Sequence, residues 1–558
     1  MLRFITAGES HGPVLTTIIE GLPAGLPVSV EKINQMLARR QGGYGRGNRM
    51  KIETDQIQLT SGVRHGLTLG SPVTMSLPNK DFKNWQSVMG IEPVEDPRAK
   101  LRRAVHRPRP GHADLVGGLK YHHEDLRNVL ERSSARETAM RVALGSVASQ
   151  LLEGLGVEVA AYVREIGGIV GEAPVGDLSL SALRERVATS PVMMVDAEKE
   201  AAVIAKIDET KKAGNTLGGV VEVIATGLPI GLGSYTQWDK KLDGRLVQAL
   251  VSINAFKGAE IGDGFELARR FGSEVMDEIA YQPERGFYRL SNHLGGIEGG
   301  MTNGMPVIVR GVKKPIPTLY RPLQSVDIYT KEPYDASIER SDTTAVPAAS
   351  VVAEAVVALE LAQAVLEKFP HDSYGELVAA VAAHREYSKN PDMWQQVDTD
   401  EEGAGKVPAV ENTDWAAQAD AKAEAESAGS GGDGGSVGNG GRVGSGEDGG
   451  RVESLMRDDN VGDSERAGSL NGAESLGSIE RAERLNGLDS SESSEGLKEL
   501  ENIEGAERLN GLDNSESSER LKRTESLADP LEARQSNRAN QTNPHQASSK
   551  QITDDKES

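Results

Sequence analysis

Two histidines in this sequence lie in short motifs whose residue types suit proton transfer beside a bound anion. His11 lies in G-E-S-H-G at 8–12, where two glycines allow the backbone to press closely against a ligand. His112 lies in R-P-G-H-A-D at 109–114, where proline and glycine hold an irregular backbone in place. A histidine titrates near neutral pH, so each can hold a proton to give. A hydrogen-bonded structural histidine is the commoner outcome, so the motifs alone leave both interpretations open.

A glycine-rich segment at 39–49, R-R-Q-G-G-Y-G-R-G-N-R, carries four arginines. It follows a helix that is predicted to start at Ser29 and to continue to about Arg39, so it does not join a strand to a helix as a dinucleotide fingerprint would. Forked guanidinium groups on flexible backbone suit phosphate or carboxylate groups. The alternative is a basic surface loop that touches nucleic acid, and the nearly neutral first 400 residues argue against it.

A further stretch, from Glu131 to Gly156, predicts a helix with a marked start and a glycine at its end. Ser134 is expected to cap this helix, with Glu137 at the spacing of a capping box. The free N–H groups of the helix start, together with Arg132 and Arg136, form a candidate anion site. The alternative is a surface helix with two solvated arginines. Glycine and alanine fill much of this helix, so other backbone could approach it closely. Apolar residues recur in it at i+4; they are Ala135, Ala139, Ala143, Val147 and Leu151.

The same arrangement recurs in R-S-D-T-T-A-V-P at 340–347, which opens an apolar helix expected over Ala348–Phe369. Pro347 suits the first turn of that helix. Asp342 lies among cations that would keep it ionised. A role as an ion-pair partner alone is the usual outcome for such an acid.

Apolar runs predict the elements that must position these motifs. Strands are expected at 14–19, 51–59, 72–77, 157–163, 220–225 and 306–312. Helices are expected at 180–188 and 197–213, and a third, capped by Asp239, ends near Ser252.

Composition excludes several kinds of site. The chain of 558 residues contains no cysteine, which rules out disulfides, thiolate nucleophiles and cysteine-based zinc sites. Y-H-H-E-D at 121–125 contains metal-ligand residue types, but adjacent residues rarely converge on one ion, so no metal is expected. No run of about 18 apolar residues predicts a membrane span, and no signal peptide is expected ahead of the first motif.

The last part of the chain differs in character from the rest. Residues 401–558 hold 34 Asp and Glu against 17 Lys and Arg, which leaves 50 and 45 in residues 1–400. A-E-R-L-N-G-L-D occurs at 482–489 and again at 506–513, and 430–450 is rich in glycine. Such a segment buries too little apolar surface to offset its chain entropy, so it is predicted to be a disordered tail.

Together these motifs resemble the chorismate synthase family. They keep the family's order and approximate spacing over residues 1 to about 385, which is the family's normal full length, and several long motifs in series are far more specific than any one. The tail departs from the family pattern. The matching stretches are G-E-S-H-G at 8–12, G-G-Y-G-R-G-N-R at 42–49, R-P-G-H-A-D at 109–114, R-S-S-A-R-E at 132–137 and R-S-D-T-T-A-V-P-A-A at 340–349.

The resemblance implies a reaction and a cofactor. The family converts 5-enolpyruvylshikimate 3-phosphate to chorismate by a 1,4-elimination of phosphate and a ring proton, in the shikimate pathway of aromatic amino acid biosynthesis. It requires reduced FMN, without net consumption of reducing equivalents. By resemblance, His11 would protonate the departing phosphate, His112 would protonate or stabilise the reduced flavin, and Asp342 would help the flavin N5 act as the base.

The residues implied in binding form two sets. Because the substrate carries a phosphate and two carboxylates, cations must oppose several anionic groups, and packed cations would repel one another in an empty site. Substrate contacts are expected from Ser10, Arg40, Arg46, Arg49, Arg109, Ser134, Arg136 and Arg340. Flavin contacts are expected from Arg132, Ser133, Ser134, Asn254, Ala255, Gly299, Lys314, Pro315, Ile316, Pro317, Thr318 and Arg340.

The resemblance also implies an α+β fold, a β-α-β sandwich in which central helices lie between two antiparallel sheets. A catalytic domain would span 1–390 and the acidic low-complexity tail 401–558. The family implies a cytoplasmic homotetramer supplied by a flavin-reducing system, with no nucleic acid or membrane partner. One alternative is an enzyme that also reduces FMN with NADPH, although no nucleotide fingerprint supports it. Another is a non-catalytic anion-binding scaffold with the tail as its interaction arm.

Overall fold

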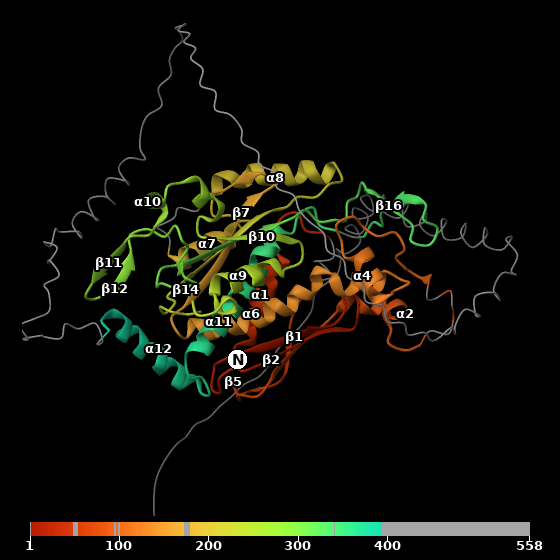
Figure 1. Cartoon of the computed structure of the whole chain (residues 1–558). Helices are drawn as coiled ribbons and strands as arrows, with labels where there is room; N and C mark the ends of the chain where they lie inside the picture. Colours follow the sequence, from red (N-terminus) through yellow and green to blue (C-terminus); the bar gives the residue numbers. More distant parts are fainter. Residues whose placement is uncertain are drawn as a thin grey trace, which may run out of the picture. The chain divides into compact units, whose positions relative to one another are not determined.

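Two antiparallel sheets organise the computed structural model, which describes residues 2–47, 54–93, 96, 98, 101–171, 179–339 and 341–391 (Figure 1). The first sheet has the strand order β1-β2-β6-β3. β1 and β2 pair from Arg3 opposite Glu20 to Ala7 opposite Thr16, so the G-E-S-H-G motif lies in the connection between them. The strands are β1 (Arg3–Ala7), β2 (Val14–Glu20), β3 (Gln58–Ser61) and β6 (Val73–Pro78).

The second sheet has the order β10-β15-β9-β7-β8. Its central strands alternate between buried and more exposed residues, the pattern of a sheet with one face on the core. β15 ends at Lys313, so the 314–318 segment begins where that strand leaves the sheet. The strands are β7 (Glu158–Ile166), β8 (Ile169–Val170), β9 (Gly219–Thr226), β10 (Phe256–Ile261) and β15 (Val307–Lys313).

Two long helices, α6 (Thr138–Glu153) and α11 (Val346–Lys368), pack against each other. α6 contacts β2 and β6 of the first sheet, and α11 contacts β7 and β9 of the second. The helix axes approach closely at Gly145, where an added Cβ would lie 2.4 Å from the Cα of Ala355. The prediction that small residues admit neighbouring backbone is therefore confirmed. Ala139, Ala143, Val147 and Leu151 are all fully buried, whereas Ala135 is exposed.

α11 is the one helix in the described part of the chain that is long and apolar enough, by length and composition, to cross a membrane. Of its most apolar window, 89% is buried inside the protein, as in the core helix of a globular fold. Its first turn contains Pro347, as predicted.

The other elements pack around or extend from these two sheets and helices in the order of the chain. The remaining helices are α1 (Val30–Gln41), α2 (Gln86–Met89), α4 (Asp114–Tyr121), α5 (Arg127–Ser133), α7 (Leu180–Thr189), α8 (Ala197–Lys212), α9 (Leu242–Val251), α10 (Gly272–Val275) and α12 (Tyr374–Lys389). Short strands pair as β4 (Val63–Arg64) with β5 (Leu67–Thr68), β11 (Ile279–Gln282) with β12 (Gly286–Arg289), β13 (Ile297–Glu298) with β14 (Met301–Thr302) and β16 (Gln324–Val326) with β17 (Pro333–Asp335).

Two of the predicted helix starts need correction. Ser134 caps a 3-10 turn at Ala135–Glu137 by accepting from the N–H of Arg136 at 3.3 Å, and α6 follows that turn. The Glu137 carboxylate bonds to Thr6 and Arg141, so it does not complete a capping box. Asp239 lies in a separate 3-10 turn, and α9 begins only at Leu242.

Other predictions agree with the structure, need correction or fall outside it. Ser29 caps α1 by accepting from the N–H of Lys32 at 3.2 Å, as predicted. The predicted strand at 51–59 is wrong over most of its length, because 54–57 form no strand and β3 begins only at Gln58. Residues 51–53 and the tail at 401–558 lie outside the described residues, as do Arg49 and Arg340.

Candidate active site

His11 lies between β1 and β2 and is almost completely buried, with 6% of its surface exposed. Its Nδ1 lies 3.0 Å from both carboxylate oxygens of Glu131, and its backbone N–H donates to the same carboxylate at 2.8 Å. The imidazole stacks on Trp85 with ring centroids 3.8 Å apart. A carboxylate on α5 and an indole therefore fix the direction and the plane of this ring.

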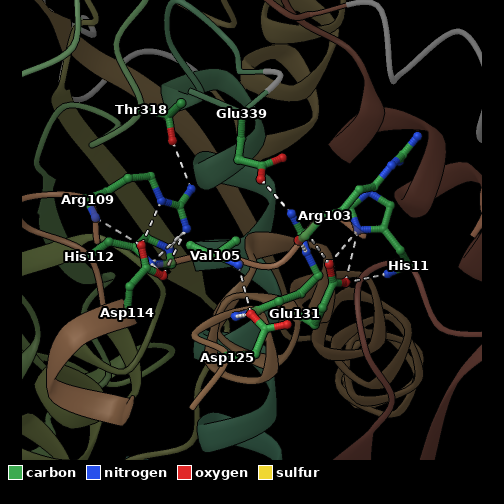
Figure 2. A network of polar contacts seen from close by, with 11 residues as sticks. His11, Arg103, Val105, Arg109, His112, Asp114, Asp125, Glu131, Thr318 and Glu339 are labelled. Atoms are coloured by element: carbon green, nitrogen blue, oxygen red, sulfur yellow. Dashed lines mark hydrogen bonds and ion pairs between the residues drawn. The ribbon is translucent and has the colours of Figure 1, made fainter. Parts of the chain in front are cut away.

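Glu131 is itself held inside the protein by cations. Arg127, one turn earlier on α5, donates to Glu131 at 3.1 Å and to Glu339 at 2.9 Å, and Figure 2 shows this network. Burial opposes ionisation of Glu131, but the hydrogen bonds from His11 and the charge of Arg127 outweigh burial and lower the pKa of the carboxyl. His11 therefore faces an ionised carboxylate.

The serines predicted beside His11 are brought to it. The hydroxyl of Ser134 donates to the hydroxyl of Ser10 at 3.1 Å, and the N–H of Ser10 donates to the Glu131 carbonyl at 3.0 Å. Arg132 is exposed and points its guanidinium at the carbonyls of Thr6 and Gly8, at 2.8 and 3.2 Å. The segment that precedes α6 and the G-E-S-H-G motif thus form one local structure.

His112 lies in a second cluster, where it also faces a carboxylate through Nδ1. That atom is 2.7 Å from Asp114, which is fully buried at the start of α4. Arg109 donates to Asp114 from its backbone, Nε and Nη2, and to the Thr318 hydroxyl at 2.9 Å. Burial would raise the pKa of Asp114, but the hydrogen bonds from His112 and Arg109 lower it well below its usual range.

Two of the arginines predicted to bind substrate share one buried acid. Asp55 accepts from Arg136 at 2.7 and 2.8 Å and from Arg40 at 3.3 Å. Arg40 also donates to Thr138 and the Ala135 carbonyl. Burial, opposed by Asp55 and reinforced by Arg136, lowers the pKa of Arg40 to about 9, so it remains charged at neutral pH. Arg136 does repel Arg40, as predicted, but Asp55 supplies a counter-ion to both arginines.

A third cationic group surrounds Asp342. The carboxylate lies 3.1 Å from Arg46 and accepts from the N–H of Gly47 at 2.6 Å, so it anchors the glycine-rich loop to the start of the α11 segment. Lys313 is buried and donates to the Lys314 carbonyl at 3.3 Å. Burial, and then the charge of Lys314, lower the pKa of Lys313 to about 8, while Asp342 opposes them.

Three of the segments predicted to bind flavin meet at the end of α9. The side-chain amide of Asn254 donates to the Ser133 carbonyl at 3.0 Å, and the Ala255 carbonyl accepts from the N–H of Lys314 at 2.9 Å. Ala255 has a φ of +71°, which is unusual for a residue with a Cβ. Within the described residues, Oδ1 of Asn254 is buried without a hydrogen-bond partner. A buried acceptor of this kind fits a ligand that carries N–H or O–H groups.

The rest of the predicted flavin set is only partly joined to these segments. Thr318 reaches the His112 cluster through Arg109, and the Ile316 carbonyl accepts from Thr216 at 2.7 Å. Pro315 and Pro317 belong to the same segment. Gly299 lies at the β13–β14 turn, where the nearest atoms to an added Cβ belong to Tyr235 and Met301. No contact links Gly299 to Asn254 within the described chain.

The comparisons with known proteins agree with one another. A sequence model of chorismate synthase matches residues 2–366. Chorismate synthase of Enterococcus faecalis is 64% identical over 389 residues, and that of Listeria welshimeri 62% over 388; each match covers 70% of this chain and all of the relative. The chain belongs to the chorismate synthase family. A solved crystal structure of a chorismate synthase, 42% identical, matches with a TM-score of 0.56 and covers 70% of this chain and 98% of that one.

Family membership gives the reaction. As a chorismate synthase, the chain is a lyase of the shikimate pathway that forms chorismate by a 1,4-elimination of phosphate from 5-enolpyruvylshikimate 3-phosphate, a step of aromatic amino acid biosynthesis. The family uses a flavin. No group of three His, Asp or Glu side chains is placed to hold a metal ion anywhere in the described part of the chain.

Sequence reasoning missed several residues of this chorismate synthase site. Asp114 lies within R-P-G-H-A-D, where an acid two positions from a histidine is a usable signal, whereas Glu131 directly precedes R-S-S-A-R-E and nothing near it in sequence points to His11. Asp55 and Trp85 lay outside every motif, and only the fold brings them to the site. Lys313 directly precedes the predicted flavin segment and is the last residue of a strand.

Proposed function

We propose that His11 is the general acid that protonates the departing phosphate. The observation that carries this proposal is the pair of 3.0 Å distances from Nδ1 to the Glu131 carboxylate. Because Nδ1 is occupied by an acceptor, Nε2 is the nitrogen left to exchange a proton with a ligand. In the elimination the ring carbon–oxygen bond breaks, phosphate leaves with the electron pair, and a proton on Nε2 neutralises the charge that develops on it.

The phosphate and carboxylates of the substrate would lie against the arginines of the site. Asp55 is shared by Arg40 and Arg136, so this group keeps a net positive charge. Arg46 and Lys313 add cations near Asp342. Fixed guanidinium groups hold a polyanion without reorganising during the reaction. Ser10 and Ser134 offer hydroxyls beside His11, and roles for Arg49, Arg109 and Arg340 in substrate binding stay predictions.

The flavin proposed for this site is reduced FMN. The donor set fits it, because the Asn254 acceptor is buried without a partner and lies beside Ser133, Ala255 and Lys314. When bound, reduced FMN supplies an electron-rich ring that permits the elimination without net redox change. Contacts from Arg132, Ser134, Gly299, Pro315, Ile316, Pro317, Thr318 and Arg340 stay predictions that rest on family membership.

The two remaining catalytic assignments are proposals of unequal support. The Nδ1 of His112 is held by Asp114 and its Nε2 lies 3.5 Å from Nη2 of Arg109, and this arrangement supports a role in holding a proton near the flavin. Asp342 is engaged by Arg46 and Gly47. We propose that it first of all anchors the glycine-rich loop, and a direct role toward the flavin stays a prediction.

We also propose the larger organisation that family membership implies. The packing of α6 on the first sheet and α11 on the second supports a β-α-β sandwich with these helices as its middle layer. A catalytic domain at 1–390 is supported by relatives that match over 388 to 389 residues and are complete without the acidic tail at 401–558. A cytoplasmic homotetramer supplied by a separate flavin-reducing system completes the proposal.

Anaerobic turnover tests this function. Phosphate release from 5-enolpyruvylshikimate 3-phosphate is measured with photoreduced FMN, and with oxidised FMN as the control. The proposal predicts release with the reduced flavin only, and an anion-binding scaffold would release none with either. Replacing photoreduction by NADPH under the same conditions decides whether the chain reduces its own flavin.

A further inference from the structure

We propose that Glu131 is the positioning residue of His11, and that Trp85 completes the support by fixing the plane of the imidazole. Together they make Nε2 the reacting nitrogen. The inference rests on the proposed function of His11 as the general acid. It concerns two residues outside the motifs that pointed to the site.

The first support is the way in which Glu131 grips His11. One carboxylate accepts from the backbone N–H of His11 at 2.8 Å and lies 3.0 Å from Nδ1 through both oxygens. The backbone bond fixes where the residue sits, and the side-chain bond fixes which nitrogen faces away. A carboxylate on one ring nitrogen selects the tautomer and therefore the atom that reacts.

The second support is the stacking of the Trp85 ring on His11. Trp85 is 3% exposed and stacks on His11 at an interplanar angle of 25°. The indole is anchored in turn, since its N–H donates to Asp81 at 3.3 Å and the Arg103 guanidinium carbon lies 4.1 Å from the ring centroid. Rotation of the imidazole about χ2 would break the Glu131 contact and collide with the indole. The ring is thus restrained about both of its side-chain torsions.

The third support is the charge around the pair. Three charged groups face the pair. Arg127 lies on α5, as Glu131 does; the other two are Glu339 and Arg103, which lies behind the indole. Arg127 is shared between Glu131 and Glu339, so the Glu131 charge is only partly cancelled and remains available to an imidazolium. If Glu131 were neutral, Arg127 would still be paired with Glu339. A neutral variant therefore leaves no buried cation without a carboxylate.

Glu354 supplies a matched control for such a variant. It is also a buried glutamate that accepts a backbone N–H, from Ala161 at 3.1 Å, and pairs with an arginine, Arg39, at 2.8 Å. It contacts no histidine among the described residues. Glu354→Gln thus removes the same charge from a similar environment without touching His11.

Kinetics give the first test, with the full-length enzyme, photoreduced FMN and substrate. Glu131→Gln should lower kcat by about 10- to 100-fold while KM changes by less than about threefold, since the lost interaction acts on the proton donor. Glu131→Asp keeps the charge and should recover part of the loss. Glu354→Gln should keep the wild-type kcat.

Fluorescence gives a second readout that a merely structural role would not move. An imidazolium quenches a stacked indole more strongly than a neutral imidazole, and the chain has four tryptophans. In flavin-free protein with Trp238, Trp394 and Trp415 replaced by Phe, Trp85 emission reports His11 protonation. Glu131→Gln should move the pH midpoint of that change downward, because the carboxylate charge that favours the imidazolium is removed. His11→Ala in the same background should abolish it.

The outcomes separate the two proposals. Wild-type kcat together with an unchanged fluorescence midpoint in Glu131→Gln overturns the positioning role. A His11→Ala enzyme with wild-type turnover overturns the acid role instead, and it does so whatever the fluorescence of the Glu131 variants shows. A kcat loss of equal size in Glu354→Gln would also overturn the positioning role, because any buried charge would then have the same effect.

Discussion

The His11 and His112 clusters solve the same local problem with different partners. Each histidine places Nδ1 against a buried carboxylate, and the Nε2 of His112 also lies 3.5 Å from Nη2 of Arg109. For His11 the carboxylate is Glu131, 120 positions away in sequence, and for His112 it is Asp114, two positions away. One histidine is therefore oriented by the packing of α5 on the β1–β2 connection, and the other by its own loop.

The two carboxylates also differ in what else depends on them. Glu131 shares Arg127 with Glu339, so its cation keeps a second acid. Asp114 accepts from His112 and from three donors of Arg109, whose other partners are the uncharged Thr318 and the ring of His112. The comparison predicts that replacing Glu131 affects the reaction more than stability, whereas replacing Asp114 affects both.

Removing each imidazole should give the largest effects and should separate the two roles. We expect His11→Ala to lower kcat by roughly 100- to 10,000-fold, the range of general acid catalysis, and to leave flavin affinity near that of the wild type. His112→Ala should weaken FMN binding more than His11→Ala does. Anaerobic phosphate release and titration with FMN measure both. Equal loss of flavin affinity in the two variants would remove the proposed division of labour.

Neutralising the two carboxylates should lower the unfolding free energy more at Asp114 than at Glu131. Asp114→Asn leaves Arg109 without an acid and should cost about 3 kcal/mol of unfolding free energy at pH 7, against about 1 kcal/mol for Glu131→Gln. Chemical denaturation of both variants checks this. A larger loss for Glu131→Gln would contradict the comparison.

The deficit of Asp114→Asn should also depend on pH. Because the pKa of Asp114 is lowered in the folded state, its stabilising contribution is present above the unfolded value of about 4 and is lost as pH falls below it. The difference between variant and wild type should therefore shrink in that acidic range. A deficit that stays constant down to pH 3 would show that geometry, and not charge, carries the contribution.

Lys313 differs from both clusters, because it is a buried cation beside Lys314 and Arg46. Its pKa of about 8 lies below the ordinary 10.5, so the unfolded chain binds the proton more tightly than the folded chain does. The charged lysine therefore lowers the unfolding free energy, and this loss is fully present below pH 8. Lys313→Met should raise the unfolding free energy of the ligand-free enzyme at pH 7 by about 1 to 3 kcal/mol.

That gain should fade as pH rises from about 8 toward 10.5, where the folded lysine is neutral. The same variant should raise KM for the anionic substrate. A lower unfolding free energy of Lys313→Met at pH 7 would contradict the claim that the buried charge of Lys313 destabilises the ligand-free enzyme.

The smallest effect is expected from the tail. A chain that ends after Pro391 should keep kcat and KM within about twofold of those of the full chain. Its denaturation midpoint should agree with that of the full chain within measurement error, because relatives are complete without the tail. A large loss of turnover would mean that the tail takes part in the active enzyme.

How much of this site the sequence could predict depends on the distance between partners. Ser29 as a cap and the small-residue face of α6 follow from local spacing, and both are confirmed. The spacing predicts that Ser134 caps α6 directly, but its hydroxyl accepts from the backbone N–H of Arg136 and so starts a 3-10 turn ahead of α6. Local patterns predict the existence of a turn more reliably than they predict which N–H donates to the capping side chain.

Tertiary pairings were out of reach. The arginines were recognised as an anion-binding set, but nothing near Arg136 in sequence points to Asp55, which lies 81 positions away. The same holds for the Glu131 carboxylate on His11 and for the Trp85 ring beside it. Residue types show that a site is cationic, and only the fold shows which acids already balance it.

Rescue of His11→Ala by free imidazole tests the central claim most directly. The truncation leaves a space bounded by Glu131 and Trp85, so added imidazole should restore anaerobic phosphate release in a concentration-dependent way, and should not do so when Glu131→Gln is also present. Phosphate release by His11→Ala at the wild-type rate without imidazole would contradict the claim that His11 delivers the proton.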